Sequence, residues 1–184
     1  MFLRRAIELL AGGLCLLALL GCEVKTSVTL GGGPSFWFGG SGRLASFRVY
    51  GPKLGHKIAT PSDTKSLVWS IQPSSGRPEG ALVTRLELVY GTVPDGYTQS
   101  VPSNGAAPQL TSGLVYYFNA ETTGAPGKGG FFYMDKTTPI LINVPDLCGS
   151  GFTGDVQPMK CGANEPYSEP RDLEQFVRDN RVQK

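Results

Sequence analysis

Short segments of alternating apolar and polar residues, separated by turn-forming residues, recur through the middle of the chain. A period of two is typical of β-strands, in which every second side chain lies on the same face. The pattern predicts strands over these residues: 44–50, 67–71, 82–90, 114–121, 131–135 and 139–144, with a short edge strand near 97–101. The clearest segment is 82–90, and its apolar side chains are expected on one face: Leu82, Leu86, Leu88 and Tyr90. This organisation favours an all-β domain.

The regions on either side of these strands have a different character. Residues 22–42 are rich in glycine and serine, which is typical of a flexible tether. Residues 170–182 predict a terminal helix, because acidic residues come early, basic residues come late, and an apolar stripe runs along one face. That stripe docks either on the domain or on a partner, and we favour the domain. The predicted organisation is a signal peptide at 1–21, a tether at 22–42, a β-sandwich at 43–144 and a C-terminal extension at 145–184.

The N-terminus carries an export signal. Arg4 and Arg5 precede an apolar run that is too short to span a bilayer, and this order is typical of a secretory signal peptide. The run ends in Leu-Leu-Gly-Cys at residues 19–22, which resembles the lipobox of bacterial lipoproteins. The resemblance implies cleavage after Gly21, lipid on Cys22, and a membrane anchor without a transmembrane helix. Because Glu23 stands where aspartate would indicate inner-membrane retention, we expect the outer membrane. The alternative to a lipoprotein is an ordinary secretory signal with an incidental cysteine.

Composition narrows the partners and the compartment. The 25 glycines and 14 prolines agree with many turns, and a formal net charge of +2 without a basic cluster argues against nucleic acid as a partner. Cys148 and Cys161 remain after the signal and the lipidated cysteine are set aside. An even pair in an exported protein predicts a disulfide bond that closes the loop of the C-terminal extension.

Residues 110–116, which begin with Leu110 and end with Tyr116, resemble the tyrosine corner of fibronectin type III and related immunoglobulin-like domains. Ser112 stands where that family usually has proline. The resemblance covers roughly residues 44–135 and includes Trp69, which is similar to the family's core tryptophan. It implies an antiparallel two-sheet sandwich in which the Tyr116 hydroxyl bonds to upstream backbone. This fold specifies no function by itself.

Catalytic and cofactor motifs are weak in this sequence. His56 is the only histidine and no GxSxG motif occurs, so a hydrolase triad is not supported. A zinc site from His56, Cys148 and Cys161 is much less favoured than a disulfide and a surface histidine. The GxGxxG pattern at residues 149–154 is followed by Pro158 where a nucleotide-binding fold needs a helix. We therefore expect no catalytic residue, no metal and no cofactor.

Two groups of residues are candidate binding surfaces. The triplet Phe36, Trp37 and Phe38 places large apolar side chains in the predicted tether, where they either dock a partner or the membrane, or cover one end of the sandwich. The second group, expected to point outward from one strand, is Val115, Tyr117 and Asn119. With either Phe131 and Tyr133 or Phe132 and Met134 it forms an aromatic face, unless the C-terminal extension covers it.

These features together predict a non-catalytic, lipid-anchored protein of the bacterial envelope. We expect its sandwich to bind another envelope protein as an assembly or adhesion component. The alternative is a surface module that binds glycans through Tyr117 and its neighbours. An enzyme is the least favoured class, since the only histidine stands alone in the sequence.

Overall fold

The computed structural model describes residues 24–59, 64–76, 79–143 and 172–182. These residues form two antiparallel β-sheets, a short 3-10 helix η1 (Thr64–Ser66) and the α-helix α2 (Leu173–Asn180). The smaller sheet has the order β1-β2-β5, with β1 (Ser27–Leu30), β2 (Ser35–Gly39) and β5 (Glu87–Val89). The larger sheet has the order β6-β4-β3-β7-β8-β9, with β6 (Tyr97–Val101), β4 (Leu67–Pro73), β3 (Arg43–Tyr50), β7 (Val115–Thr123), β8 (Lys128–Asp135) and β9 (Thr138–Ile142).

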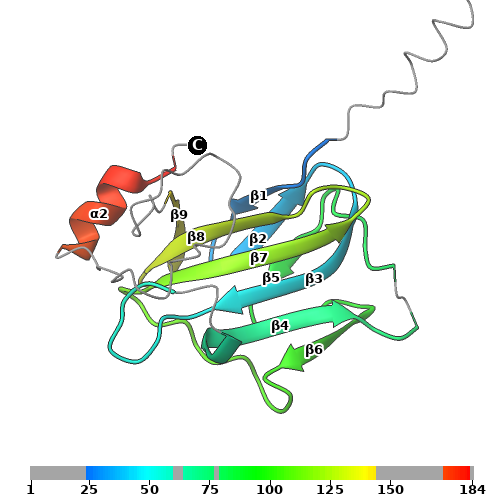
Figure 1. Ribbon diagram of the computed structural model, residues 1–184, viewed down its shortest axis with the longest axis horizontal. Coiled ribbons are helices and arrows are strands. Elements are labelled where there is room, and N and C mark those ends of the chain that lie inside the picture. Colours follow the sequence, from blue (N-terminus) through cyan, green and yellow to red (C-terminus); the bar gives the residue numbers. More distant parts are fainter. Residues whose placement is uncertain (1–23, 60–63, 77–78, 144–171, 183–184) are drawn as a thin grey trace, which may run out of the picture.

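The two sheets pack face to face as a β-sandwich (Figure 1). Phe36 of the smaller sheet makes edge contacts with Phe47 and Phe132 of the larger one, with ring centroids 4.8 and 5.5 Å apart. We call the buried apolar residues between the sheets the inter-sheet core. Its largest members are Phe36, Leu44, Phe47, Trp69, Ile71, Leu88, Phe118 and Phe132. The predicted all-β sandwich is thus confirmed at the level of two packed antiparallel sheets.

Most predicted strands are confirmed, with ends that differ by up to three residues. The short segment near 97–101 is β6, and it lies at an edge of the larger sheet as expected. The prediction of one long strand over 82–90 was wrong, because only Glu87–Val89 forms a strand of the sheet and Leu82 makes just an isolated bridge with Arg43. Arg85 has a left-handed φ of 63°, which interrupts the alternation. As a result Val83 is buried in the inter-sheet core and Leu82 is exposed.

The prediction that residues 22–42 form a flexible tether was also wrong for its described part. Residues 27–39 form a hairpin of β1 and β2, in which Val28 pairs with Phe38 and Leu30 with Phe36. The glycine-rich runs are the turn after β1 and the turn after β2, where Gly33, Gly40 and Gly42 have positive φ. The physical reason is burial: Phe36 and Phe38 face the inter-sheet core, and this apolar area fixes the strand.

The predicted terminal helix is confirmed as α2, and it lies on the outer face of the larger sheet (Figure 1). Asp172 caps its N-terminus by accepting a hydrogen bond from the Gln175 amide. We call the buried apolar residues on this face the outer cluster: Ile58, Ala59, Val115, Tyr117, Phe131, Ile142, Leu173 and Val177. In the described part of the chain, no helix has the length and apolar character needed to cross a membrane. The predicted lipidation site Cys22 and the predicted disulfide partners Cys148 and Cys161 lie outside the described residues.

Candidate functional site

The triplet at residues 36–38 is divided between the core and the surface. Phe36 and Phe38 are buried in the inter-sheet core, whereas Trp37 is 49% exposed on the outer face of the smaller sheet. Trp37 pairs with Thr29 on one side and with Glu87 on the other, and both of these residues are exposed. Its indole lies across Gly31, where any larger side chain would overlap the ring. Of the three predicted surface residues, only Trp37 is available to a ligand.

The predicted aromatic face around Tyr117 is not a free surface. Val115 and Tyr117 are buried in the outer cluster beneath α2, and Asn119 is half-buried. The hairpin partner contributes Phe131 and Tyr133 to this face, since Phe132 and Met134 point into the inter-sheet core. The alternative in which the C-terminal extension covers this face is therefore correct for α2. Leu173 and Val177 provide the apolar stripe that does so.

Burial also sets the chemistry of Tyr117. Desolvation raises the pKa of its phenol to about 12, and the neighbouring Tyr50, with ring centroids 6.0 Å apart, adds to the shift. The Tyr117 side chain lies over Gly129 of β8, which leaves room for the phenol only because it lacks a Cβ. Tyr117 is therefore a neutral, buried member of the outer cluster, and its ring is not exposed for a sugar to stack on.

A groove of about 550 Å³ lies between the edges of the two sheets. It runs between the end of β1 and strand β9, and residues Arg181 and Val182 border it. We call it the edge groove; its described lining is Thr29, Leu30, Gly31, Thr138, Pro139, Ile140, Leu141, Arg181 and Val182. Its walls are mostly apolar, with one exposed cation at Arg181. A cavity of this size and character accommodates an extended peptide or a small apolar ligand.

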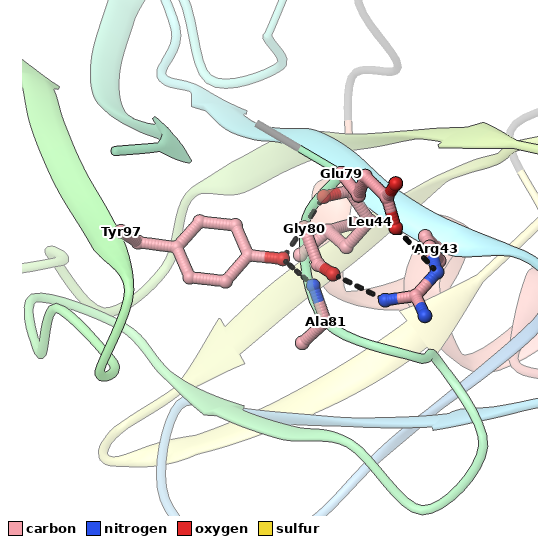
Figure 2. A network of polar contacts seen from close by, with 6 residues as sticks. All are labelled: Arg43, Leu44, Glu79, Gly80, Ala81 and Tyr97. Atoms are coloured by element: carbon pink, nitrogen blue, oxygen red, sulfur yellow. Dashed lines mark hydrogen bonds and ion pairs between the residues drawn. The ribbon is translucent and has the colours of Figure 1, made fainter. Parts of the chain in front are cut away.

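A polar network fixes the chain at the opposite end of β1, next to the start of β3. Figure 2 shows the Tyr97 hydroxyl between two backbone groups, accepting from the Ala81 amide at 2.8 Å and donating to the Leu44 carbonyl at 2.9 Å. The Arg43 guanidinium donates to the Gly80 carbonyl at 2.9 Å and lies 3.7 Å from the Glu79 carboxylate. Burial raises the pKa of Tyr97, so its hydroxyl remains a donor. The network holds residues 79–81 against β3.

At the other end of the sandwich, Tyr116 forms the predicted corner contact. Its hydroxyl accepts a hydrogen bond from the Thr111 amide at 2.8 Å, and its ring stacks on Phe132. Trp69 is fully buried, and its indole nitrogen donates to the Gln99 side chain at 3.0 Å. Beside the corner lies a smaller cavity of about 250 Å³, bordered by Tyr90 and residues 106–110. Burial raises the pKa of Tyr90, whose hydroxyl donates to the Pro108 carbonyl.

The residues that the sequence offered for catalytic or metal chemistry lie only partly within the described ranges. His56 is exposed in the loop after β3, and within the described ranges no three His, Cys, Asp or Glu side chains gather as metal ligands. The GxGxxG pattern at 149–154 lies outside the described residues.

Sequence reasoning missed the edge groove. The signal was weak, because the groove arises where β1 and β9, more than a hundred residues apart, end two different sheets. Leu30 and Ile140 are ordinary strand residues in the sequence. Predicting the open edge of β1 would have required the prediction that residues 27–39 form a hairpin.

Comparison with known proteins finds no match for this chain: no family model matches it, and no curated protein or solved structure is significantly similar to it. Its function is therefore inferred from its own residues and their geometry.

Proposed function

We propose that this protein is a non-catalytic lipoprotein of the bacterial outer membrane, whose β-sandwich binds another envelope protein. The lipobox-like Leu-Leu-Gly-Cys at residues 19–22 supports a lipid anchor on Cys22. In an exported protein the pair Cys148 and Cys161 supports a disulfide bond. Substitution of Cys22 by serine tests the anchor: the precursor should stay uncleaved and carry no lipid, and normal processing would refute it.

We infer that the sandwich is of the fibronectin type III-like, immunoglobulin-like kind. The strand order β3-β7-β8 corresponds to the C-F-G order of such domains, and β1-β2-β5 corresponds to A-B-E. The bond from the Thr111 amide to Tyr116, at the start of β7, supports the tyrosine corner. Strands β6 and β9 are additions to this plan. Trp69 lies in β4, between β6 and the strand β3 that corresponds to C.

The observation that carries protein binding is the edge groove beside an open strand. Gly31 donates its amide to the Ser35 carbonyl of the β1–β2 hairpin at 3.0 Å. Because ladder bonds alternate along an antiparallel strand, the backbone groups of Val28 and Leu30 then point away from β2, and Leu30 lines the groove. Among the described strands, none pairs with that edge of β1.

An extended segment of a partner protein fits such a site by adding a strand to β1. Main-chain hydrogen bonds then supply affinity, and the apolar groove receives alternate side chains. Leu30 and Ile140 line the groove, and Arg181 at its border favours a partner segment with an acidic residue. Strand addition also protects an edge that would otherwise favour aggregation.

Site-specific photo-crosslinking in intact cells tests this function. Thr138 and Thr98 are exposed threonines on β9 and β6, the two opposite edges of the larger sheet, and only Thr138 lines the edge groove. A photo-reactive residue at 138 should capture one defined protein at least about tenfold more than the same residue at 98. Equal capture at both positions, or none at 138, would refute the groove as the binding site.

Glycan binding is the second candidate, and the exposed indole of Trp37 favours it. Sugars stack on exposed aromatic rings, and the neighbouring Thr29 and Glu87 can hydrogen-bond to hydroxyl groups. A glycan array with the mature protein and its Trp37→Ala variant tests this candidate. Binding that is lost in the variant would support it, and the absence of binding to any glycan would exclude it.

A further inference from the structure

The domain begins much closer to the proposed lipid than a tether would allow. The Val24 carbonyl accepts hydrogen bonds from the Ser41 amide at 3.2 Å and the Ser41 hydroxyl at 2.7 Å, so Val24 is already fixed to the turn after β2. Cys22 lies only two residues earlier in the chain. Two extended residues reach ~7 Å, so a lipid on Cys22 leaves the sandwich almost no distance from the bilayer surface.

The end of the sandwich that would meet the bilayer carries exposed apolar side chains. Val24 is 57% exposed and Leu82 is 59% exposed. Leu82 forms an isolated bridge with Arg43, and Ser41 beside it holds Val24, so the two apolar side chains lie on neighbouring segments. Figure 1 shows the start of β1, the turn between β2 and β3 and the turn between β7 and β8 at this same end. We call it the Val24 end.

The outward position of Leu82 is fixed by the structure around it. The Arg43–Tyr97 network in Figure 2 holds residues 79–81 on β3, and Val83 is fully buried on the other side of Leu82. A leucine held outward between a bonded segment and a core valine has no intramolecular surface to cover. What bears on an interaction is that Leu82 and Val24 are exposed on neighbouring segments, since exposed apolar side chains that gather at one place mark interaction sites more than single ones do.

Charge at the Val24 end matches an anionic lipid surface. Its described segments, residues 24–26, 39–43, 79–86 and 121–128, contain four basic side chains and two acidic ones. The acidic ones, Glu79 and Glu121, are each paired with an arginine. Arg85 is exposed at a left-handed φ of 63°, a conformation that costs an arginine stability and that glycine or asparagine would adopt more easily. An arginine at a strained, exposed position indicates a use for its charge.

We propose that the Val24 end rests directly on the surface of an anionic bilayer, with Val24 and Leu82 in the interface and Arg85 beside lipid phosphates. This inference rests on the proposed lipidation of Cys22, and it adds an orientation. β7 has nine residues and spans ~30 Å. The β1–β2 turn and the edge groove next to it then face away from the membrane, where a partner can reach them. The domain then has a fixed orientation on the membrane and is not connected to its anchor by a flexible tether.

Photo-crosslinking to lipid tests this orientation in the full, natively processed protein. A benzophenone amino acid replaces Leu82 in one variant and Leu54 in the control. Leu54 is 104% exposed and follows β3 at the opposite end of the sandwich. After irradiation in native membranes, phospholipid adducts at 82 should exceed those at 54 by at least about tenfold. Equal adduct yields, or a protein adduct at 82 in place of lipid, would overturn the proposal.

The mass of the N-terminal peptide distinguishes this failure from failure of the anchor. If Cys22 carries lipid and residue 82 captures no phospholipid, the orientation is wrong and the lipoprotein assignment stands. If Cys22 carries no lipid, the anchor itself is refuted, and the orientation falls with it.

The charge component is tested separately in vesicles that contain the lipidated protein. Vesicles of phosphatidylethanolamine with one-third phosphatidylglycerol are compared with vesicles that hold only zwitterionic lipid. Adduct formation at 82 should be about fivefold higher on the anionic vesicles, the factor for one basic residue at such a surface. Arg85→Asn removes the charge while tolerating the positive φ, so it should abolish most of that gain. An unchanged gain would overturn the role of Arg85.

Discussion

Strands β7, β8 and β9 of the larger sheet carry buried residues on both faces, but the two faces are covered in different ways. On the inner face, the inter-sheet core joins two sheets through large aromatic side chains such as Phe36 and Phe47. On the outer face, the outer cluster is closed by a single eight-residue helix and by Ile58 and Ala59 of a loop. The inner face is held by many aromatic rings in mutual contact, whereas α2 contributes only two buried side chains, Leu173 and Val177, to the outer face.

Strand β7 belongs to both regions. Tyr116, Phe118 and Ala120 face the inter-sheet core, and Val115 and Tyr117 face the outer cluster. A strand covered on both sides has a nearly continuous apolar run, unlike the alternation of a strand with one wet face. The two sets of side chains on β7 therefore contribute to different parts of the stability. The inner set holds the two sheets together, and the outer set holds the C-terminal helix.

The largest expected effect comes from truncating an aromatic of the inter-sheet core. Phe36→Ala should lower the free energy of unfolding by about 3–5 kcal/mol, because a fully buried phenylalanine leaves a cavity between the sheets. The adjacent Trp37→Ala should lower it by less, about 1–2 kcal/mol, since half of that side chain is exposed. Urea unfolding of the mature protein measures both. A small effect from both variants would mean that residues 24–42 form a tether after all.

The next effect concerns pH and the outer cluster. The folded-state pKa of Tyr117, about 12, lies above the ordinary value of 10.0, so the folded state holds this proton more tightly than the unfolded state. Its contribution is therefore complete below pH 10 and is lost as pH rises from 10 to 12. At about 1.4 kcal/mol per pKa unit, the loss is on the order of 2 kcal/mol.

Comparison with a Tyr117→Phe variant isolates this contribution from other tyrosines. The variant has no phenol at 117 to ionise, so its unfolding free energy should fall less between pH 10 and 12 than that of the unchanged protein. Denaturant unfolding at several pH values gives both curves. Parallel curves would show that Tyr117 is not desolvated beneath α2.

A smaller effect should follow from loosening the helix. Leu173→Ala removes a buried side chain at the first turn of α2 and should cost about 2 kcal/mol, at the low end for such changes because it lies at the margin of the cluster. The loss should appear as local opening, in which α2 amides exchange faster and β3 amides stay protected. The exposed Arg178→Ala in the same helix is the control and should leave exchange nearly unchanged. Equal acceleration in β3 would show that the outer cluster and the inter-sheet core unfold as one unit.

The contrast between the two regions also explains what the sequence could predict. Alternation and turn residues located most strands, because burial of one face leaves a period of two. They failed at residues 22–42, where glycine-rich turns dominated the composition and only Phe36 and Phe38 indicated a strand. They failed again at residues 82–86, because an arginine rarely adopts a left-handed backbone conformation and the sequence therefore contains no indication of it at Arg85.

The candidate site was harder to predict than the strands. Tyr117 was correctly expected to point away from Tyr116, but its exposure depended on whether residues 173–177 would pack there. To predict the edge groove, one would need to know how the two sheets pack and that Val182 bonds to Leu141. Both are properties of the tertiary structure. Trp37 was identified from its residue type, and only the alternation of β2 shows that it is the exposed member of its triplet.

The smallest expected effect separates packing from hydrogen bonding within the inter-sheet core. Tyr116→Phe keeps the ring that stacks on Phe132, with centroids 5.5 Å apart, and removes only the hydroxyl that accepts from the Thr111 amide. Because Thr111 is exposed, water can replace the lost partner, so the cost should be about 1 kcal/mol in urea unfolding. A cost above about 3 kcal/mol would mean that the corner contact, and not the aromatic packing, determines how residues 110–116 enter β7. The inner face would then depend on one polar contact, as the outer face depends on one helix.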